Sequence, residues 1–433
     1  MSRVVVVGAG VIGLWCALEL RGRGADVVVL DKGRPGAGCS AGNAGWIVPS
    51  LSGPLPAPGL RGRLLRWAVM RAGPVYVAPR ADPELLQWVW RFWGRCNATD
   101  YARGFEAIVR FHEESRSLYD VAAQQGLEFE LHRTGLLFLF LGRSEQHHIR
   151  RDLARLAARG YEVAEELDAR AVQALEPAVG RGVVGGILAK GDWHVRPESL
   201  TAALAERLRI LGVPVRTDVD VQGFDVAGGR VMACRTCAGR VAFDQCVIAA
   251  GAWSGPLLRQ VGYRLPVQAG KGYSVTVTPP PFRVHRPLYL AEAKVACSPF
   301  RGAIRMAGTM EFSGLNVRLD RRRVAAMDRA VARFLPGWRS RDAGQEWVGM
   351  RAVTPDGLPV IGQVPGFDNL YVATGHAMLG VSLAPATARG VGRLLAGERP
   401  ALLAPFDPAR FAGRTAGARG PGSQASRGEL AGP

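Results

Sequence analysis

The feature that most constrains this chain is the stretch from Val4 to Asp31, which reads VVVVGAGVIGLWCALELRGRGADVVVLD. A run of valines leads into a turn that contains Gly8, Gly10 and Gly13. An apolar helical pattern follows, and a second valine-rich strand ends at the acid. Strand, glycine turn, helix and strand in this order are the fingerprint of a dinucleotide-binding fold. The sequence therefore predicts a Rossmann-type α/β domain at its start.

Each glycine of this turn has its own physical task. Gly8 permits the tight turn, Gly10 lets the backbone approach a pyrophosphate, and Gly13 lets the helix pack closely on the strand. The N–H groups and the partial positive charge of the helix N-terminus then face the phosphates. Asp31 stands where a carboxylate can accept hydrogen bonds from both hydroxyls of a ribose. The alternative is an ordinary glycine-rich turn between a strand and a helix.

Length and charge limit the other functions. The chain has 433 residues, so it can bury a large core and is expected to form two domains. Its net charge of +18 comes from arginines dispersed along the chain, so we expect no nucleic-acid partner. An attraction to anionic membranes stays open. No apolar run is long enough to span a membrane and the start has no signal-peptide pattern. We therefore expect a cytoplasmic protein, with a peripheral contact at the inner face of the plasma membrane left open.

The seven cysteines are scattered and odd in number, which indicates a reducing compartment. Cys234 and Cys237 form a CxxC, but no second pair follows at zinc spacing, so we expect a chance spacing on a hairpin and no metal site. Tryptophans at 67, 88, 90 and 93 fall in a mainly helical stretch, 61–130. They are interpreted as core, or as an apolar surface for a membrane or a partner.

Further elements follow from local patterns. A long loop over 35–60, rich in Gly, Ala, Ser and Pro, hints at function by its length. The other expected segments are a strand at 135–141, a charged helix at 144–159, a helix at 197–211, a β-sheet pattern at 264–320, and a tail at 413–433 with the composition of a disordered segment.

A second glycine turn near the C-terminus distinguishes between the two kinds of dinucleotide cofactor, nicotinamide and flavin. Residues 369–397 read as strand, glycine turn and helix, which a nicotinamide enzyme does not need. A reduced flavin carries negative charge on its ring, and the N–H groups of Leu379, Gly380 and Val381 could stabilise that charge. We therefore expect a flavin. The stretch Gly251–Ser254 opens a further turn after a buried strand.

Five segments carry motifs that occur together in one family. They are VVVVGAGVIG (4–13), CSAGNAGWIVPS (39–50), GKGYS (270–274), WVGMRAVTPDGLPVIG (347–362) and TGHAMLGVS (374–382). With them, and with the helical stretch around residues 95–97, the chain resembles the D-amino-acid oxidase superfamily of FAD-dependent oxidoreductases, and within it the bacterial D-amino-acid dehydrogenases. The resemblance implies an FAD-binding domain from segments 1–75, 197–262 and 346–410, and a mixed-sheet, α+β substrate-binding domain from 76–196 and 263–345.

The resemblance also implies three catalytic residues. Arg351 falls on the arginine that binds the substrate carboxylate, and a planar guanidinium suits that task. Tyr273 matches a tyrosine near the substrate, and His376 matches a histidine of the C-terminal glycine turn. The alternatives are a structural salt bridge for Arg351, a core tyrosine for Tyr273, and a histidine bonded to a nearby carbonyl for His376.

The resemblance further implies the residues that hold FAD. Asn43 to Trp46 would lie along the flavin ring, and the backbone of Val221 would meet the adenine. The full expected set is Gly8, Gly10, Val11, Ile12, Gly13, Asp31, Lys32, Ser40, Asn43, Ala44, Gly45, Trp46, Val221, Ala250, Gly251, Trp253, Gly349, Gly375, Met378, Leu379, Gly380 and Val381. No signature for covalent attachment is visible, so we expect noncovalent FAD.

The sequence departs from the dehydrogenase pattern at three places. Cys39 replaces a threonine, Ala377 replaces a glycine, and the stretch 192–197 (DWHVRP) is closer to the glycine and sarcosine oxidase branch.

The predicted reaction is oxidative deamination of a small amino acid, of D configuration, to a 2-oxo acid and ammonia. Hydride would pass from Cα to flavin N5, so no protein base at Cα is required, and positioning would do most of the work. The electron acceptor would be a quinone, oxygen or a partner protein. The alternatives are an oxidase of glycine, sarcosine or hydroxyproline, and the flavin subunit of a multi-subunit dehydrogenase.

Overall fold

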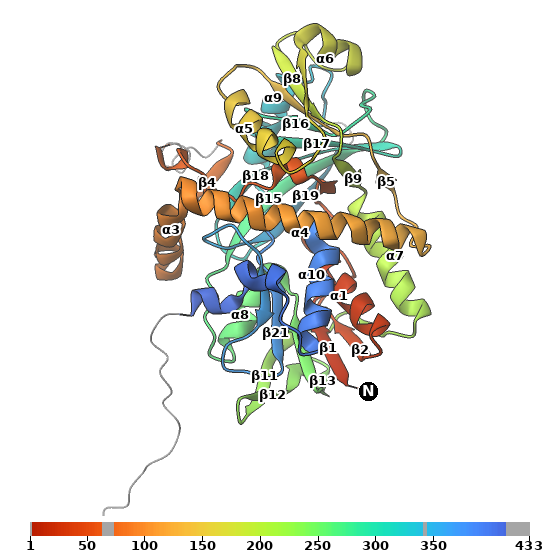
Figure 1. Cartoon of the computed structure of the whole chain (residues 1–433), viewed down its shortest axis with the longest axis vertical. Helices are drawn as coiled ribbons and strands as arrows, with labels where there is room; N and C mark the ends of the chain where they lie inside the picture. Colours follow the sequence, from red (N-terminus) through yellow and green to blue (C-terminus); the bar gives the residue numbers. More distant parts are fainter. Residues whose placement is uncertain (1, 63–72, 341–343, 413–433) are drawn as a thin grey trace, which may run out of the picture.

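Parallel pairing of short apolar strands builds one half of the molecule, the lower half in Figure 1. The computed structural model describes residues 2–62, 73–340 and 344–412. Neighbouring strands of the six-stranded sheet pair in parallel, except that β20 is antiparallel to β21. In spatial order the strands are β10 (Val215–Arg216), β2 (Asp26–Leu30), β1 (Arg3–Val7), β14 (Gln245–Ile248), β21 (Leu370–Thr374) and β20 (Val360–Gln363).

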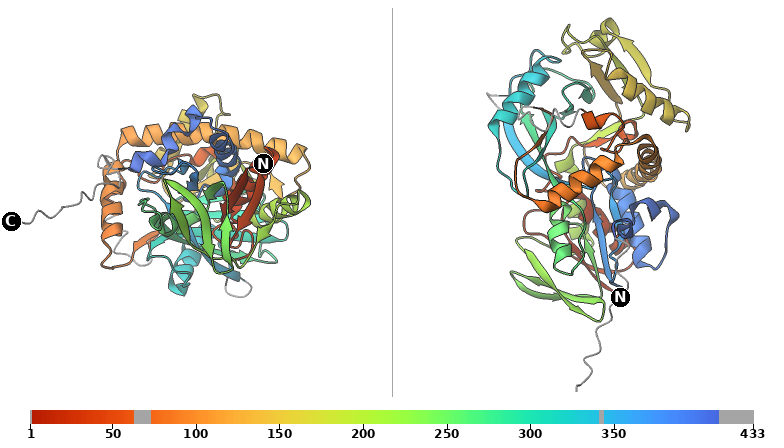
Figure 2. Two further views of the ribbon diagram at one scale, coloured as in Figure 1. Left: turned by 90° about the horizontal axis from the view of Figure 1, so that it is seen from below. Right: turned by 90° about the vertical axis from the view of Figure 1, so that its left-hand side faces the viewer.

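Both faces of this sheet are covered, which explains why β1 is apolar at successive positions. Val4 and Val6 point into a core shared with α1 (Val11–Gly22), α7 (Pro197–Ile210) and α10 (Gly380–Leu395). Val5 and Val7 point the other way, toward α8 (Ser254–Arg259) and a three-stranded antiparallel sheet. The strands of that sheet are β11 (Val221–Ala227), β12 (Arg230–Thr236) and β13 (Gly239–Ala242). Figure 2 shows this small sheet at the end of the molecule.

A nine-stranded mixed sheet forms the other half. Its main path runs in the order β19, β15, β18, β17, β16, β6, β8, β7, and β4 pairs with β18. The bounds are β4 (Val75–Val77), β6 (Leu136–Phe140), β7 (Glu165–Asp168), β8 (Gly185–Ala189), β15 (Gln268–Val277), β16 (Leu288–Leu290), β17 (Val295–Phe300), β18 (Ala303–Phe312) and β19 (Gly344–Val353). The associated helices are α5 (Gln146–Ala157), α6 (Ala169–Leu175) and α9 (Arg321–Ala332).

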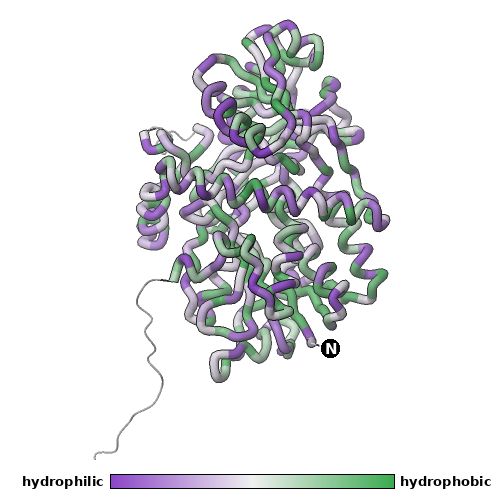
Figure 3. The backbone as a smooth tube through the Cα atoms, in the orientation of Figure 1, coloured by the Kyte–Doolittle hydropathy of each residue, from purple (hydrophilic) through white to green (hydrophobic). Residues whose placement is uncertain are grey.

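Helix α4 (Ala98–Gln124) runs along the boundary between the two halves (Figures 1 and 2). Apolar and polar segments alternate along it (Figure 3), as expected for a helix with one buried face. The side chain of Asn97 caps its first turn, and Asp82 caps α3 (Pro83–Arg95) in the same way. The remaining elements are β3 (Trp46–Ile47), β9 (Trp193–Val195) and β5 (Leu131–His132), which pair with one another, and the short 3₁₀ turns Pro49–Leu51, Gly251–Trp253, Ala401–Phe406 and Pro408–Phe411.

The expected fold class is confirmed: a Rossmann-type α/β part stands beside a mixed-sheet part. Some strands do not follow the expected chain segments. β3, from the segment 1–75, pairs with β9 of the segment 76–196, and β4 crosses the boundary between these two segments. β19 begins at Gly344 and is the terminal strand of the nine-stranded sheet, whereas the expected boundary at 346 assigned it to the FAD-binding part. The division into domains otherwise stays a prediction. The tail 413–433 and Trp67 lie outside the described residues.

A proline inside α10 ties this helix to α4. Pro385 has no N–H, so the carbonyl of Val381, four positions earlier, loses its helical partner. The Tyr119 hydroxyl donates to that carbonyl at 2.7 Å, and the Ser115 hydroxyl donates to the carbonyl of Ser382 at 2.6 Å. Both donors come from α4, so α4 fixes the first turn of α10.

This arrangement predicts the effect of Tyr119→Phe. The variant should lower the free energy of unfolding by about 1–3 kcal/mol, because it leaves a buried carbonyl without a donor. In a Pro385→Ala background the N–H returns, so Tyr119→Phe should cost clearly less there. Urea unfolding of the four proteins of this double-mutant cycle measures both costs. Equal costs in the two backgrounds would show that Tyr119 does not replace the missing N–H.

Candidate functional site

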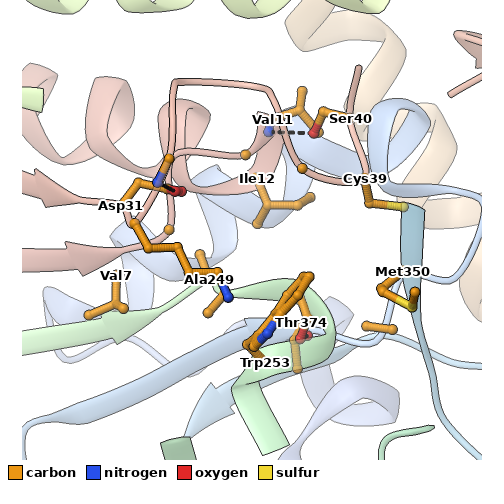
Figure 4. A pocket seen from close by; sticks show the side chains of 18 of the residues that line it. Val7, Val11, Ile12, Asp31, Cys39, Ser40, Ala249, Trp253, Met350 and Thr374 are labelled. Atoms are coloured by element: carbon orange, nitrogen blue, oxygen red, sulfur yellow. Dashed lines mark hydrogen bonds between the residues drawn. The ribbon is translucent and has the colours of Figure 1, made fainter. Parts of the chain in front are cut away.

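A cavity of about 700 Å³ opens at the carboxyl ends of the parallel strands. This edge of an open α/β sheet is where such folds bind ligands. Figure 4 shows Asp31 toward one end of the cavity and Cys39 with Met350 toward the other, with Ile12 facing Trp253 and Thr374 across it. An elongated ligand with chemically different ends would therefore fit this space.

The β1–α1 turn forms one wall of the cavity. Gly8 has φ +111°, and a methyl group there would lie 2.5 Å from the carbonyl oxygen of Ala249. A methyl group at Gly13 would overlap the carbonyl of Gly8, so the helix can approach the turn only without a side chain there. Gly10 is the N-terminal capping residue of α1 and carries no side chain toward the cavity. The turn thus exposes helix N–H groups to an anion.

Two side chains are bonded to this turn. The Ser40 hydroxyl accepts a hydrogen bond from the N–H of Val11 at 3.0 Å, and its own proton is available for a phosphate oxygen. The Asp31 carboxylate accepts from the N–H groups of Ala9 at 2.6 Å and Gly33 at 2.8 Å. These bonds fix the orientation of the carboxylate, and its remaining lone pairs can still accept from ribose hydroxyls.

The first turn of α10 forms the opposite wall. Gly380 and Val381 line the cavity, as does His376, which lies in the turn between β21 and α10. The Thr387 hydroxyl donates to the carbonyl of Leu383 at 2.8 Å, so it must accept from His376 Nε2 at 2.9 Å. His376 is therefore the Nε2–H tautomer, and burial lowers its pKa from 6.5 to about 3. The imidazole ring of His376 is therefore neutral at physiological pH.

The loop between β2 and β3, residues 31–45, is held to the nine-stranded sheet by Arg305. Its guanidinium is buried and donates to the carbonyls of Ala41 at 2.8 Å and Asn43 at 2.9 Å. It also bonds the hydroxyl of Thr276 at 2.8 Å and the carboxylate of Glu198. One side chain thus joins the loop, the sheet and the first turn of α7.

Arg351 stands on β19 and faces this loop. Its Nη1 donates to the carbonyl of Thr309 at 2.5 Å, and the guanidinium lies directly over Gly272 of β15. Thr309 has φ +60°, in the left-handed region, which coincides with an irregularity in the β15–β18 register. Among the described residues no carboxylate pairs with Arg351, and burial lowers its pKa. An anion entering beside it would relieve that unfavourable burial.

The side chain of Tyr273 does not lie beside that of Arg351, although the expected site placed both near the substrate. Arg351 pairs with Gly270 across the β15–β19 ladder, so both side-chain positions share one face of the sheet. Tyr273 lies three residues further along β15 and therefore points to the other face. There its hydroxyl donates to Glu311 at 2.7 Å, in a buried network with Lys271 and Arg323. Tyr273 thus shares its face of the sheet with Met350, which lines the cavity, and its expected role near the substrate stays a prediction.

The structure brings most of the expected cofactor residues to one cavity. Those that line it are Gly8, Gly10, Val11, Ile12, Asp31, Lys32, Ser40, Asn43, Val221, Ala250, Gly251, Trp253, Gly375, Gly380 and Val381. The expected residues that do not line it are Gly13, Ala44, Gly45, Trp46, Gly349, Met378 and Leu379. Of these, Leu379 is the N-terminal capping residue of α10, and the Trp46 indole donates to the Ser298 hydroxyl at 2.9 Å.

The sequence did not predict several other residues that line the cavity. Ala249, Ala373 and Thr374 follow or end the strands β14 and β21, and Cys39 and Met350 lie toward the far end. Ala249, Ala373 and Thr374 share one signal, their position at the carboxyl end of a parallel strand, which the valine-rich pattern could have indicated. The stretch 192–197, by contrast, lines no part of this cavity. The guanidiniums of Arg116 and Arg133 both lie over the Trp193 ring.

No group of three or more potential metal-ligating side chains occurs among the described residues. Cys234 is buried and Cys237 exposed, on β12 and the turn that follows it. Within the same described part of the chain, no helix is both long and apolar enough to cross a bilayer.

The fold and the cavity are those of a dinucleotide-binding protein, with the N-termini of α1 and α10 at the cavity. The chain belongs to the DAO family, described as FAD dependent oxidoreductase, which matches residues 3–394. The protein is therefore an FAD-dependent oxidoreductase, as its resemblance implied. The glycine cradle, the fixed Asp31 and the exposed helix N–H groups fit this cofactor.

Two relatives are similar over nearly the whole chain. A D-amino acid dehydrogenase of Granulibacter bethesdensis is 32% identical over 422 residues, which cover 95% of this chain and 100% of the relative. A D-amino acid dehydrogenase of Methylobacterium nodulans is 35% identical over 415 residues, covering 92% and 96%. The solved glycine oxidase of Geobacillus kaustophilus has a TM-score of 0.75 at 23% identity, covering 95% of this chain and 99% of that one. The last likeness concerns the fold alone.

The buried His376 predicts a pH effect on stability. Its pKa is about 3 in the folded chain and 6.5 when exposed, so between these values the unfolded chain binds a proton that the folded chain does not. The stabilisation is present above pH 6.5 and is lost as the pH falls toward 3. In His376→Asn the slope of unfolding free energy against pH should drop by up to about 1.4 kcal/mol per pH unit. Urea titrations at several pH values compare the slopes; identical slopes would mean that His376 titrates normally.

Proposed function

We propose that the cavity holds FAD with its pyrophosphate at the N-terminus of α1 and its adenosine ribose at Asp31. Helix N–H groups and the Ser40 hydroxyl support the first assignment, and the oriented carboxylate supports the second. The flavin ring then belongs near Cys39, Met350 and the first turn of α10, whose partial positive charge stabilises an anionic reduced ring. Bound noncovalently, FAD supplies the acceptor for two electrons from the substrate.

The proposed reaction is the oxidation of the Cα–N bond of a small amino acid of D configuration, which gives a 2-oxo acid and ammonia after hydrolysis. Arg351 carries this proposal, because it is a partly buried guanidinium with no carboxylate partner among the described residues. Its Nη1 is bonded to Thr309, so the rest of the planar group is left to bind a substrate carboxylate. The names of the relatives support an amino acid as the substrate and favour the D enantiomer.

His376 has a limited part in this proposal. It is neutral and bonded through Nε2 to Thr387, so its Nδ1 can only accept a hydrogen bond. The turn that it occupies sets the start of α10 beside the cavity. We therefore propose that His376 orients this turn rather than transferring a proton.

The test is an anaerobic screen of amino-acid enantiomers, with bleaching of the flavin absorbance as the readout. A D-amino acid should reduce the wild-type flavin. Arg351→Lys keeps the charge but loses the planar group, so substrate binding should weaken by about 1.5–3 kcal/mol, tenfold or more in apparent KM.

Two controls accompany this screen. FAD content, measured after denaturation, should be unchanged in Arg351→Lys, because Arg351 is not assigned to the cofactor. Unchanged kinetics for every active amino acid would exclude Arg351 as the anchor. Reduction of the wild-type flavin by glycine or sarcosine, and by no D-amino acid, would select an amine oxidase instead. Oxygen consumption with peroxide formation, against turnover only with a quinone or a dye, identifies the electron acceptor.

We also propose a peripheral contact between α3 and an anionic bilayer. Leu86, Val89 and Trp90 expose 66%, 37% and 76% of their surface on the outer side of this helix. Tryptophan favours the membrane interface, and a net charge of +18 favours anionic lipids.

Trp90→Glu should reduce co-sedimentation with anionic vesicles several-fold. Val163→Glu, at a residue that is 74% exposed elsewhere, is the matched control. Equal losses in both variants would point to net charge alone.

A further inference from the structure

One aromatic side chain on the Arg351 face of the sheet has no role in the proposed reaction. Trp347 precedes Arg351 by four positions on β19, so both side chains leave the same face of the strand. Gly349 stands between them on that face. A methyl group at Gly349 would overlap the outer edge of the Trp347 indole, so the ring lies flat across this glycine.

The same ring reaches the loop between β2 and β3. A methyl group at Gly42 would also overlap the indole, on the side of the ring nearer its fused bond. Trp347 therefore lies between the strand that carries Arg351 and the loop that Arg305 holds in place. Two positions without side chains, Gly42 and Gly349, make the room that the indole fills.

Arg351 occupies the neighbouring position on this face. Its guanidinium lies over Gly272, and Gly272 is the partner of Gly349 across the β15–β19 ladder. Directly opposed residues of an antiparallel pair have Cα atoms about 4.5–5.5 Å apart. The indole and the guanidinium thus lie side by side over two paired glycines.

Among residues 2–62, 73–340 and 344–412, the other neighbours recorded for the Arg351 guanidinium carry no charge. They are the Thr309 carbonyl, the Met310 sulfur at 3.8 Å from Nη1, and the Cys39 thiol. A carboxylate held there finds one cation and surroundings that are otherwise apolar or weakly polar. The rest of the ligand must extend over the same face, because the backbones of β15 and β19 lie behind it.

We propose that Trp347 determines which substrate side chains the enzyme accepts, by forming the wall beside the carboxylate site of Arg351. This inference rests on the proposed function of Arg351. The indole fills the space over Gly42 and Gly349, so it favours amino acids with small, uncharged side chains and excludes bulky ones. Trp347 is a specificity-determining residue that leaves the reacting bond untouched.

The test uses the FAD-loaded enzyme and simple monocarboxylates, whose binding perturbs the visible absorbance of the oxidised flavin. Propionate represents a small side chain and 3-phenylpropionate a bulky one. The wild type should bind propionate more tightly than it binds 3-phenylpropionate. Trp347→Ala should shift the ratio of the two Kd values by about tenfold or more toward the bulky ligand, and Trp347→Phe by less. The ratio of kcat/KM for phenylalanine to that for alanine, in the active enantiomer, should shift in the same direction.

Matched variants separate this role from a general effect. Trp90→Ala removes an exposed tryptophan on α3 and should leave both ratios unchanged. Gly349→Ala keeps the tryptophan but displaces its ring, so it should alter the ratios. If Trp347→Ala fails to retain FAD, Trp347→Phe and Gly349→Ala decide the question.

Ratios equal to wild type in variants that retain FAD would overturn the inference about Trp347 while leaving Arg351 as the anchor. If no monocarboxylate perturbs the wild-type flavin and no amino acid reduces it, the proposed function fails as well. The two failures are therefore distinguishable in one set of titrations.

Discussion

The buried guanidinium of Arg305 is the interaction on which the site depends. It belongs to β18, yet it bonds two carbonyls of the loop between β2 and β3 and a carboxylate at the start of α7. The loop is long and rich in small residues, so it has little apolar surface of its own to hold it. Charge-assisted bonds inside the protein are strong and directional. They fix the loop between the cofactor cavity and the sheet that carries Arg351, and thus bring two halves of the molecule to one site.

The half with the six-stranded sheet could be predicted well from the sequence, because the sequence patterns that specify it are local. The valine strands, the glycine turn and Asp31 lie within one short stretch, and the structure places them at one cavity wall. The helix 197–211 was similarly clear, since proline opens it and three leucines four residues apart are fully buried. In such segments hydrophobic period and turn chemistry point to the same answer.

The half with the nine-stranded sheet could not be predicted to the same depth, because the pairing of strands that are distant in the sequence determines which side chains meet there. Whether Tyr273 meets Arg351 depends on the register between β15 and β19, and a shift by one residue would reverse the face. No local pattern contains that register. A partial signal was nevertheless present: Trp347, Gly349 and Arg351 alternate along one strand, so a β interpretation of this motif already places them on one face.

The position of β19 at the end of its sheet has an evolutionary consequence. Its ladder pairs with β15 alone, so side chains on it have fewer cross-strand neighbours than those of a central strand. The β1–α1 turn, by contrast, is packed against several elements, and added atoms there collide with backbone. Changes on β19 can therefore be tolerated where changes at the turn cannot. A lineage with this fold can diversify the amino acids it oxidises while its cofactor chemistry remains fixed.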